Sequence, residues 1–164
     1  MNDEETFLYF GYGSNLDKEA MNLRCPSNKE VASVVLEDYR MIYNNYATIE
    51  KSTGDKVLGA VYEIAKKDLS NLDYYEGYPR LYNRKTYTVK DLGTGEKIEA
   101  MGYFMENPEF RLPSDVYFLT LVQGYRDWNL PLDHLYQNYA KNQELAQDRK
   151  VDVAELRRFY SEGV

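Results

Sequence analysis

The sequence is poor in the residues that most often hold metals or form cross-links. Its 164 residues include one cysteine, Cys25, and one histidine, His134. A lone cysteine allows neither a disulfide nor a thiolate metal site within one chain, so we expect Cys25 to be a small, buried or half-buried side chain. With one histidine, a metal site would have to consist of carboxylates, and no loop shows that pattern. The sequence therefore predicts no bound metal.

Basic residues and long apolar stretches are also scarce. Lysine and arginine number 20 against 27 aspartates and glutamates, which gives a net charge of −7. A nucleic-acid partner requires a basic patch that replaces counterions, and no basic run is present, so we expect no such partner. No apolar stretch approaches about 18 residues, and Met1–Glu5 is acidic and unlike a signal peptide. We therefore predict no membrane partner and a cytoplasmic location.

The length and the aromatic content indicate one domain with a ring-rich interior. We predict a single domain over residues 1–164, with roughly the last 20 residues as a candidate peripheral helix. The chain has 17 tyrosines and one tryptophan. Tyrosine combines an apolar ring with a polar tip, so many of these side chains should be half-buried with a hydrogen-bonded hydroxyl.

One stretch, Tyr9–Leu16 (YFGYGSNL), reads as a strand that enters a loop loosened by two glycines. The apolar and aromatic residues over 7–10 are typical of a buried strand. A helical pattern begins at Asp17, an acidic residue suited to the start of a helix. The backbone amides of residues 13–15 are then expected beside a helix N-terminus, where they suit a carboxylate or phosphate oxygen.

Three common interpretations of such a loop fail on residue identity. The dinucleotide fingerprint requires glycine where Leu16 stands, and the phosphate-binding P-loop requires a Gly-Lys-Ser/Thr ending that is absent. A nucleophilic Ser14 would require glycines in place of Tyr12 and Leu16. An ordinary strand-to-helix turn is the alternative that the residues alone leave open.

The rest of the chain reads as strands followed by helices, with one helix inserted at 65–75. We expect a strand at 31–44 that is divided or bulged at 37–39, loops at 44–48 and 52–55, a strand at 57–64, and a hairpin of 82–91 and 98–105. Ser114 and Asn129 are expected to cap the two helices that follow. This order fits an α+β domain with an antiparallel or mixed sheet.

Glu76 lies at the expected end of the inserted helix, with Gly77 as the C-terminal stop. A carboxylate at the negative end of a helix dipole gains nothing from the dipole, so the pKa of Glu76 is expected to rise slightly. This setting suits a proton carrier better than a purely structural glutamate. A surface glutamate at a helix end is nevertheless the commoner case.

Three segments resemble the γ-glutamylcyclotransferase-like family, in the order in which that family carries them. They are FGYGSNL at 10–16, DYYEGYP at 73–79 and PSDVY at 113–117, the last followed by Gly124 and Asn129-Leu130-Pro131. Members of the family cyclise a γ-glutamyl group to 5-oxoproline and release an amine. The resemblance implies a small closed or nearly closed mixed β-barrel flanked by helices.

The resemblance also implies an enzyme and assigns roles to individual residues. Glu76 matches the family's catalytic glutamate and would carry the proton. The substrate contacts would come from Tyr12, Gly13, Ser14, Asn15, Leu16, Tyr82, Tyr103 and Tyr117. The implied partner is a small γ-glutamyl substrate, no cofactor is implied, and the chain would be a monomer or a homodimer. Tyr75 and Tyr78, beside Glu76, are expected to narrow the mouth of the pocket together with Tyr82.

Two alternatives stay open at this point. The first keeps the cyclotransferase and changes its substrate from a γ-glutamyl amino acid to a γ-glutamyl amine or a biosynthetic intermediate. The second is a non-catalytic module that binds a small acid in the same pocket. Glu76 argues against the second, because a protein that only binds an anion would bind it better without that negative charge.

Overall fold

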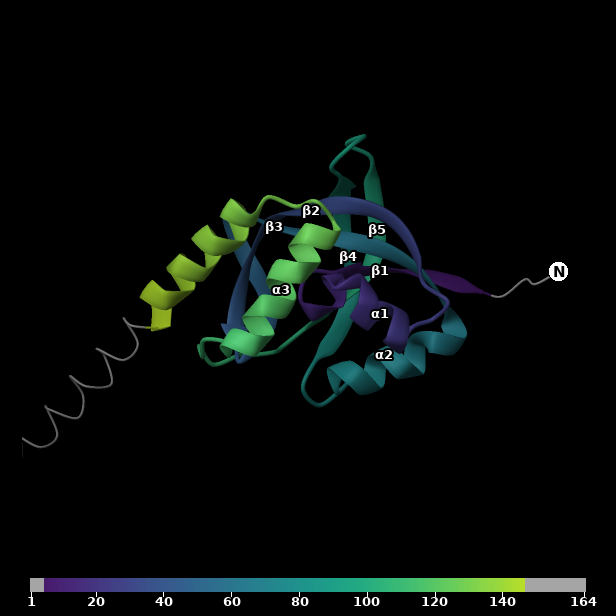
Figure 1. Cartoon of the computed structure of the whole chain (residues 1–164), viewed down its shortest axis with the longest axis horizontal. Coiled ribbons are helices and arrows are strands. Elements are labelled where there is room, and N and C mark those ends of the chain that lie inside the picture. Colours follow the sequence, from purple (N-terminus) through teal and green to yellow (C-terminus); the bar gives the residue numbers. More distant parts are fainter. Residues whose placement is uncertain (1–4, 147–164) are drawn as a thin grey trace, which may run out of the picture.

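A computed structural model describes residues 5–146, and its centre is a closed five-stranded barrel (Figure 1). The strands are β1 (Thr6–Gly11), β2 (Lys29–Asn44), β3 (Tyr46–Ala65), β4 (Asn83–Asp91) and β5 (Lys97–Phe104). They follow one another around the barrel in the order β1-β3-β2-β4-β5. Neighbours pair antiparallel except β1 and β5, which meet in parallel at Tyr9 and Met101. The α+β class and the closed mixed barrel are confirmed.

Helices cover one side and one end of this barrel (Figure 1). They are α1 (Lys18–Arg24), α2 (Leu69–Glu76), α3 (Asp115–Asp127), a helix over 132–146, and the 3₁₀ turns η1 (Ser14–Leu16) and η2 (Lys66–Asp68). α3 packs on η1, and α1 packs on α2. The candidate peripheral helix of roughly the last 20 residues lies almost wholly outside the described residues.

Within residues 5–146, none of the helices combines the length and the apolar character needed to cross a membrane. Cys25 is buried, as expected from its isolation in the sequence.

The strand β3 is longer than the sequence predicts: it begins within the first segment expected to be a loop and includes the second. Residues 44–48 belong to a tight β2–β3 hairpin in which Asn45 takes up the left-handed turn with a φ of 63°. Residues 52–55 form an irregular insertion where the register shifts between Glu37 and Tyr39 on β2, which confirms the bulge expected there. Asparagine and glycine in these segments are compatible with a hairpin turn and a bulge as well as with a loop.

Asn129 ends α3 and does not cap the next helix, contrary to the prediction. It has a φ of 56° and follows the last helical turn, where asparagine is one of the few residues that tolerate a left-handed backbone. Its amide donates to the Arg126 carbonyl, and the Leu130 amide donates to the Tyr125 carbonyl. These two bonds form a Schellman motif, so a polar residue between two helices was assigned to the wrong helix.

Gly124 allows α3 to approach η1 closely. A Cβ at this position would overlap the side chain of Leu16 and press on the backbone of Leu16 and Asp17 at 3.0 and 3.1 Å. Leu16 itself is fully buried, and Leu121 and Tyr125 on the same helix are buried with it. The contact between α3 and η1 therefore depends on the missing side chain of Gly124.

We expect Gly124→Ala to destabilise the domain by about 1–3 kcal/mol, the usual cost of adding a methyl group to a filled core. Urea unfolding measures the effect. The matched control is Gly93→Ala in the exposed β4–β5 turn, where the added Cβ would lie 3.3 Å from one Asp91 carboxylate oxygen and meet no core side chain. That control should change stability by less than about 0.5 kcal/mol. Equal stability of the two variants would contradict close packing of α3 on η1.

Candidate active site

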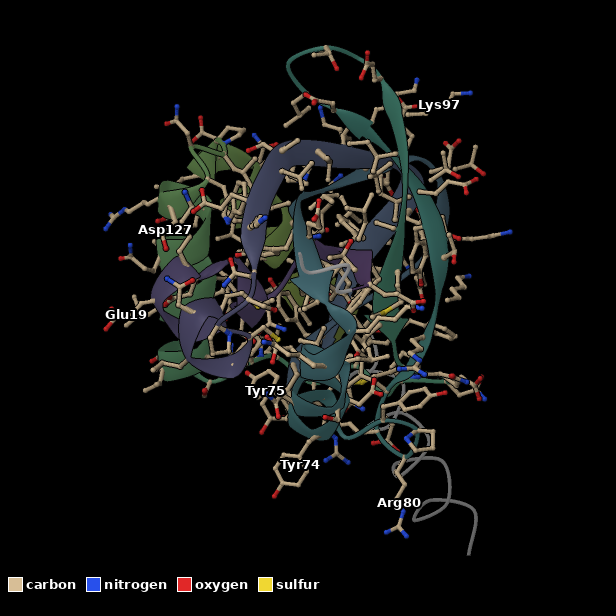
Figure 2. The ribbon with its side chains drawn as sticks, turned by 90° about the vertical axis from the view of Figure 1, so that its right-hand side faces the viewer. Glu19, Tyr74, Tyr75, Arg80, Lys97 and Asp127 are labelled. Atoms are coloured by element: carbon tan, nitrogen blue, oxygen red, sulfur yellow. The ribbon has the colours of Figure 1, made fainter. Side chains whose placement is uncertain are left out.

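A pocket of about 250 Å³ opens at the end of the barrel where η1 and α2 meet. Figure 2 shows this end at Tyr75, with Lys97 at the start of β5 at the opposite end. The lining residues are mostly tyrosines: Tyr9, Tyr12, Gly13, Ser14, Asn15, Tyr46, Ala47, Tyr75, Glu76, Leu81, Tyr82, Tyr103 and Tyr117. Within the described part of the chain, no cluster of histidine, cysteine, aspartate or glutamate has the geometry of a metal site.

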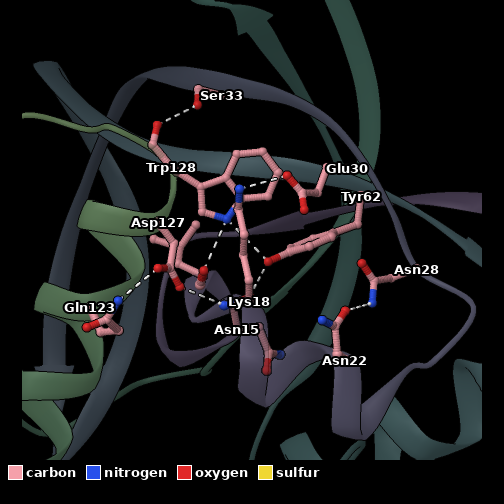
Figure 3. A network of polar contacts seen from close by, with 11 residues as sticks. Asn15, Lys18, Asn22, Asn28, Glu30, Ser33, Tyr62, Gln123, Asp127 and Trp128 are labelled. Atoms are coloured by element: carbon pink, nitrogen blue, oxygen red, sulfur yellow. Dashed lines mark hydrogen bonds and ion pairs between the residues drawn. The ribbon is translucent and has the colours of Figure 1, made fainter.

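The turn η1 is fixed from behind by side chains of the barrel and of the end of α3 (Figure 3). The Trp128 indole N–H donates to the Leu16 carbonyl at 3.0 Å, and the Tyr62 hydroxyl donates to the Asn15 carbonyl at 2.7 Å. The buried carbonyls of Asn15 and Leu16 thus both have hydrogen-bond donors within the protein. The side chains of Ser14 and Asn15 line the pocket on the opposite side of the turn.

α2 brings Glu76 into the pocket from its last turn. Asp73, one helical turn earlier, accepts a hydrogen bond from the Tyr103 hydroxyl at 2.6 Å and two from Arg84 at 2.6 and 2.8 Å. Gly77 ends the helix in the left-handed conformation with a φ of 68°, as predicted. Because residues three apart share a helix face, the attachment of Asp73 to the barrel also fixes where Glu76 enters the pocket.

The Glu76 carboxyl is half-buried, and one of its oxygens accepts a hydrogen bond from the Asn15 side-chain amide at 3.1 Å. Burial raises the pKa of Glu76 from 4.5 to about 7, and the charge of Arg24 opposes this rise. The sequence attributed a slight rise to the helix end, whereas burial is the first cause. A carboxyl that is partly ionised near neutral pH can both accept and donate a proton.

Three of the tyrosine hydroxyls donate their protons to acceptors of the protein itself. Tyr12 donates to the carbonyl of Tyr103 at 2.7 Å, and Tyr82 donates to the carbonyl of Ala47 at 2.6 Å. Tyr103 donates to Asp73. Burial raises the pKa of all three hydroxyls, so these phenols stay neutral. They supply apolar ring surface to the pocket while their polar ends support its wall.

Two other tyrosines keep a proton for a ligand. The Tyr9 hydroxyl accepts a hydrogen bond from the Asn15 amide at 2.9 Å, and the Tyr117 hydroxyl accepts one from the Ala47 amide at 3.0 Å. A phenol that accepts in this way still has its own O–H to donate. Burial raises the pKa of Tyr9 and of Tyr117, and the charge of Glu76 adds to both rises. The pocket therefore combines neutral donors with one carboxyl.

The structure brings together all but one of the residues predicted to contact a substrate. The exception is Leu16, whose side chain is fully buried in the core beside Gly124 and does not line the pocket. Tyr78 does not line it either, because its ring lies under the Arg84 guanidinium at 4.2 Å. Of the other two residues predicted to narrow the mouth, Tyr75 is half-exposed and lies at the pocket's edge, whereas Tyr82 is buried and belongs to the inner wall.

Sequence reasoning missed Tyr9, Tyr46, Ala47 and Leu81 in the pocket wall, together with Arg24 behind it. Tyr46 and Ala47 were missed because their segment was taken for a loop. Their strand is defined by its pairing with β2, which no local pattern in the sequence reveals. Arg24 stands in the last turn of α1, where a cation is ordinarily explained by the helix dipole.

Comparisons with known proteins agree with the fold. The sequence profile of the family "Gamma-glutamyl cyclotransferase, AIG2-like" matches residues 9–129. The gamma-glutamylcyclotransferase of Homo sapiens is 34% identical over 148 residues, which cover 80% of this chain and 77% of the human protein.

Solved structures give the same result. A gamma-glutamyl cyclotransferase structure superimposes with a TM-score of 0.76 and 32% identity, covering 83% of this chain and 88% of that one. The crystal structure of an uncharacterized protein from Homo sapiens superimposes with a TM-score of 0.77 and 33% identity, covering 84% and 88% of the two chains. The chain belongs to the gamma-glutamyl cyclotransferase, AIG2-like family, a family of enzymes.

The raised pKa of Glu76 predicts a specific dependence of stability on pH. An acid whose pKa is higher in the folded state stabilises the fold below its unfolded pKa, here 4.5, and this contribution is lost as the pH rises through about 7. Glu76→Gln stays neutral throughout. Relative to wild type, we therefore expect Glu76→Gln to gain on the order of 2 kcal/mol between about pH 5 and about pH 8.

Urea unfolding of both proteins at the two pH values measures this difference. The matched control is Glu99→Gln on β5, where the side chain is exposed. Its stability relative to wild type should not change with pH in this way. If the two glutamine variants show the same pH dependence, Glu76 is not a buried acid.

Proposed function

We propose that this protein converts γ-glutamyl amides to 5-oxoproline and a free amino acid or amine. The observation that carries the proposal is the single carboxyl of Glu76, with a pKa of about 7, in a small pocket of neutral tyrosines. Membership of the family supports the reaction type. A pocket of about 250 Å³ is near the lower end of the range for ligand sites, which suits a small substrate.

The reaction is an internal aminolysis. The α-amine of the glutamyl group attacks its own γ-carbonyl, a C–N bond closes the five-membered ring, and the C–N bond to the leaving amine breaks. Because nucleophile and electrophile belong to one molecule, correct orientation supplies much of the acceleration. Glu76 accepts a proton from the α-ammonium and returns it to the leaving nitrogen, which a carboxyl with a pKa near neutrality does efficiently. The ring nitrogen loses its second proton as the lactam forms, and the released amine takes up that proton as an ammonium.

The other end of the pocket holds the glutamyl group in this proposal. The substrate's α-carboxylate binds at the turn of residues 13–15, where Tyr117 offers its hydroxyl proton next to Gly13. The Tyr117 oxygen lies 3.3 Å from the position that a Cβ on Gly13 would occupy, so glycine leaves room for this approach. Neutral donors suit a carboxylate in a protein of net charge −7, because they act at short range.

The leaving group lies toward the rim of the pocket. Tyr46, Tyr75 and Leu81 line the pocket and are also half-exposed, so they form its outer edge. Apolar and aromatic side chains predominate there, which favours a small amino acid or amine over a long polar peptide tail. A γ-glutamyl amine is therefore accommodated as well as a γ-glutamyl amino acid.

Glu76→Gln should lower turnover of a γ-glutamyl dipeptide by about 10²–10⁴-fold, because it preserves the shape of the side chain and removes its basicity. Substrate binding should change little. Release of 5-oxoproline measures turnover, and calorimetry with the substrate measures binding. Glu99→Gln serves again as the control and should turn over like wild type.

The alternative is a non-catalytic module that binds a small acid. It would be identified if wild type turned over no γ-glutamyl compound and Glu76→Gln bound the substrate more tightly than wild type.

Intact glutathione should be a poor substrate. Its cysteinyl-glycine tail would have to pass the rim formed by Tyr46, Tyr75 and Leu81, whereas a single small residue need not. We expect 5-oxoproline release from γ-glutamyl-alanine to exceed that from glutathione by at least about tenfold, or about 1.4 kcal/mol. Equal rates from the two compounds would contradict a narrow rim without affecting the reaction type.

A further inference from the structure

We propose that Arg24 is a positioning residue for this reaction, because its guanidinium holds the Asn15 side-chain amide in the one orientation that donates to Glu76. Arg24 does not line the pocket and belongs to α1, whereas Asn15 and Glu76 line the pocket from η1 and α2. It therefore acts on the reacting groups through Asn15. The catalytic meaning of this inference rests on the proposed function, whereas its geometry does not.

The hydrogen bonds form a continuous path from α1 to the carboxyl. Arg24 donates to the Asn15 side-chain oxygen at 2.5 Å. The amide nitrogen of the same side chain donates to Glu76 at 3.1 Å and to the Tyr9 hydroxyl at 2.9 Å. Asn15 is 2% exposed, so water does not replace these partners.

An asparagine amide has an acceptor end and a donor end, and these fit different partners. Arginine has only donors, so it can bind only the oxygen of Asn15. The nitrogen must then face Glu76 and Tyr9. If the amide turned over, its oxygen would face the Glu76 carboxylate, where two acceptors repel. Arg24 thus removes an alternative arrangement that would leave Glu76 without its donor.

Arg24 is itself held in place. Its guanidinium lies over the ring of Tyr75 at 3.5 Å from the ring centre, and the Tyr75 hydroxyl forms a hydrogen bond with Ser14 at 2.8 Å. Arg24 also occupies the last turn of α1, where a cation is stabilised by the helix dipole. The planar group can stack and donate at once, which a lysine ammonium cannot reproduce.

The positive charge of Arg24 favours the ionised form of Glu76, as does the hydrogen bond that Asn15 donates. Arg24 is the cation that opposes the rise in the pKa of Glu76. The charge of Glu76 in turn raises the pKa of five phenols, which are neutral: Tyr9, Tyr12, Tyr82, Tyr103 and Tyr117. The nearby Arg84 is paired with Asp73. Loss of Arg24 should therefore raise the pKa of Glu76 further.

Two variants separate charge from orientation. Arg24→Gln removes both, so kcat should fall by about 10- to 100-fold and the acid limb of the kcat/KM profile should move to higher pH. Arg24→Lys retains the charge and loses the planar stack, so kcat should fall while the acid limb stays near that of wild type. Arg126→Gln, on the exposed last turn of α3, removes the same charge from the surface and should leave both unchanged.

A carboxyl titration by ¹³C NMR reads the Glu76 pKa without substrate, and Glu76→Gln assigns its signal. The titration midpoint should rise in Arg24→Gln and stay near wild type in Arg24→Lys.

A wild-type protein that turns over no γ-glutamyl compound overturns the proposed function, whatever the titration shows. An active wild type with an unchanged Glu76 titration and unchanged kcat in Arg24→Gln overturns the positioning role. If Arg24→Gln fails to fold, a kcat of Arg24→Lys equal to wild type overturns it equally.

Discussion

The hydrogen bond from the Asn15 amide to the Glu76 carboxyl joins two segments 61 residues apart, and the rest of the pocket is built around it. One segment is the turn η1, fixed from behind by Trp128 and Tyr62. The other is the end of α2, attached to the barrel through Asp73. Each partner is therefore held by contacts other than this bond. The donor and the carboxyl therefore meet without cost at the time of reaction, which is the physical meaning of a preorganised site.

Burial of an ionisable carboxyl opposes folding, and the tyrosines around Glu76 stabilise the domain in spite of it. Their rings exclude water, which raises the pKa of Glu76. Their hydroxyls donate hydrogen bonds to two backbone carbonyls and to the Asp73 carboxylate. Phenylalanine would exclude water equally well and would leave carbonyls such as that of Ala47 without a donor. The tyrosines of the pocket wall thus combine apolar surface with hydrogen-bond donors for buried acceptors.

The sequence predicted those parts of the structure in which local chemistry and tertiary packing agree. The strand before Gly11, the helix end at Gly77 and the hairpin of β4 and β5 all follow from local patterns. Tyr46 and Ala47 could not be assigned, because their strand is defined by pairing with β2 and not by its own residues. Asn129 was assigned to the wrong helix because the same residue type suits both ends. The path from Arg24 to Glu76 depends on three-dimensional contacts that no spacing reveals.

Closure of the barrel by β1 and β5 has a consequence for how the site comes into existence. The pocket takes its wall from the first strand, the β2–β3 hairpin, α2, the last strand and α3, so most of its contacts join residues distant along the chain. Contacts of this kind form late in folding, because the loops between them must close first. A partly folded chain has the tyrosines and the glutamate but no pocket, and the pKa of its glutamate is ordinary. Acid–base reactivity thus arises only with the complete topology.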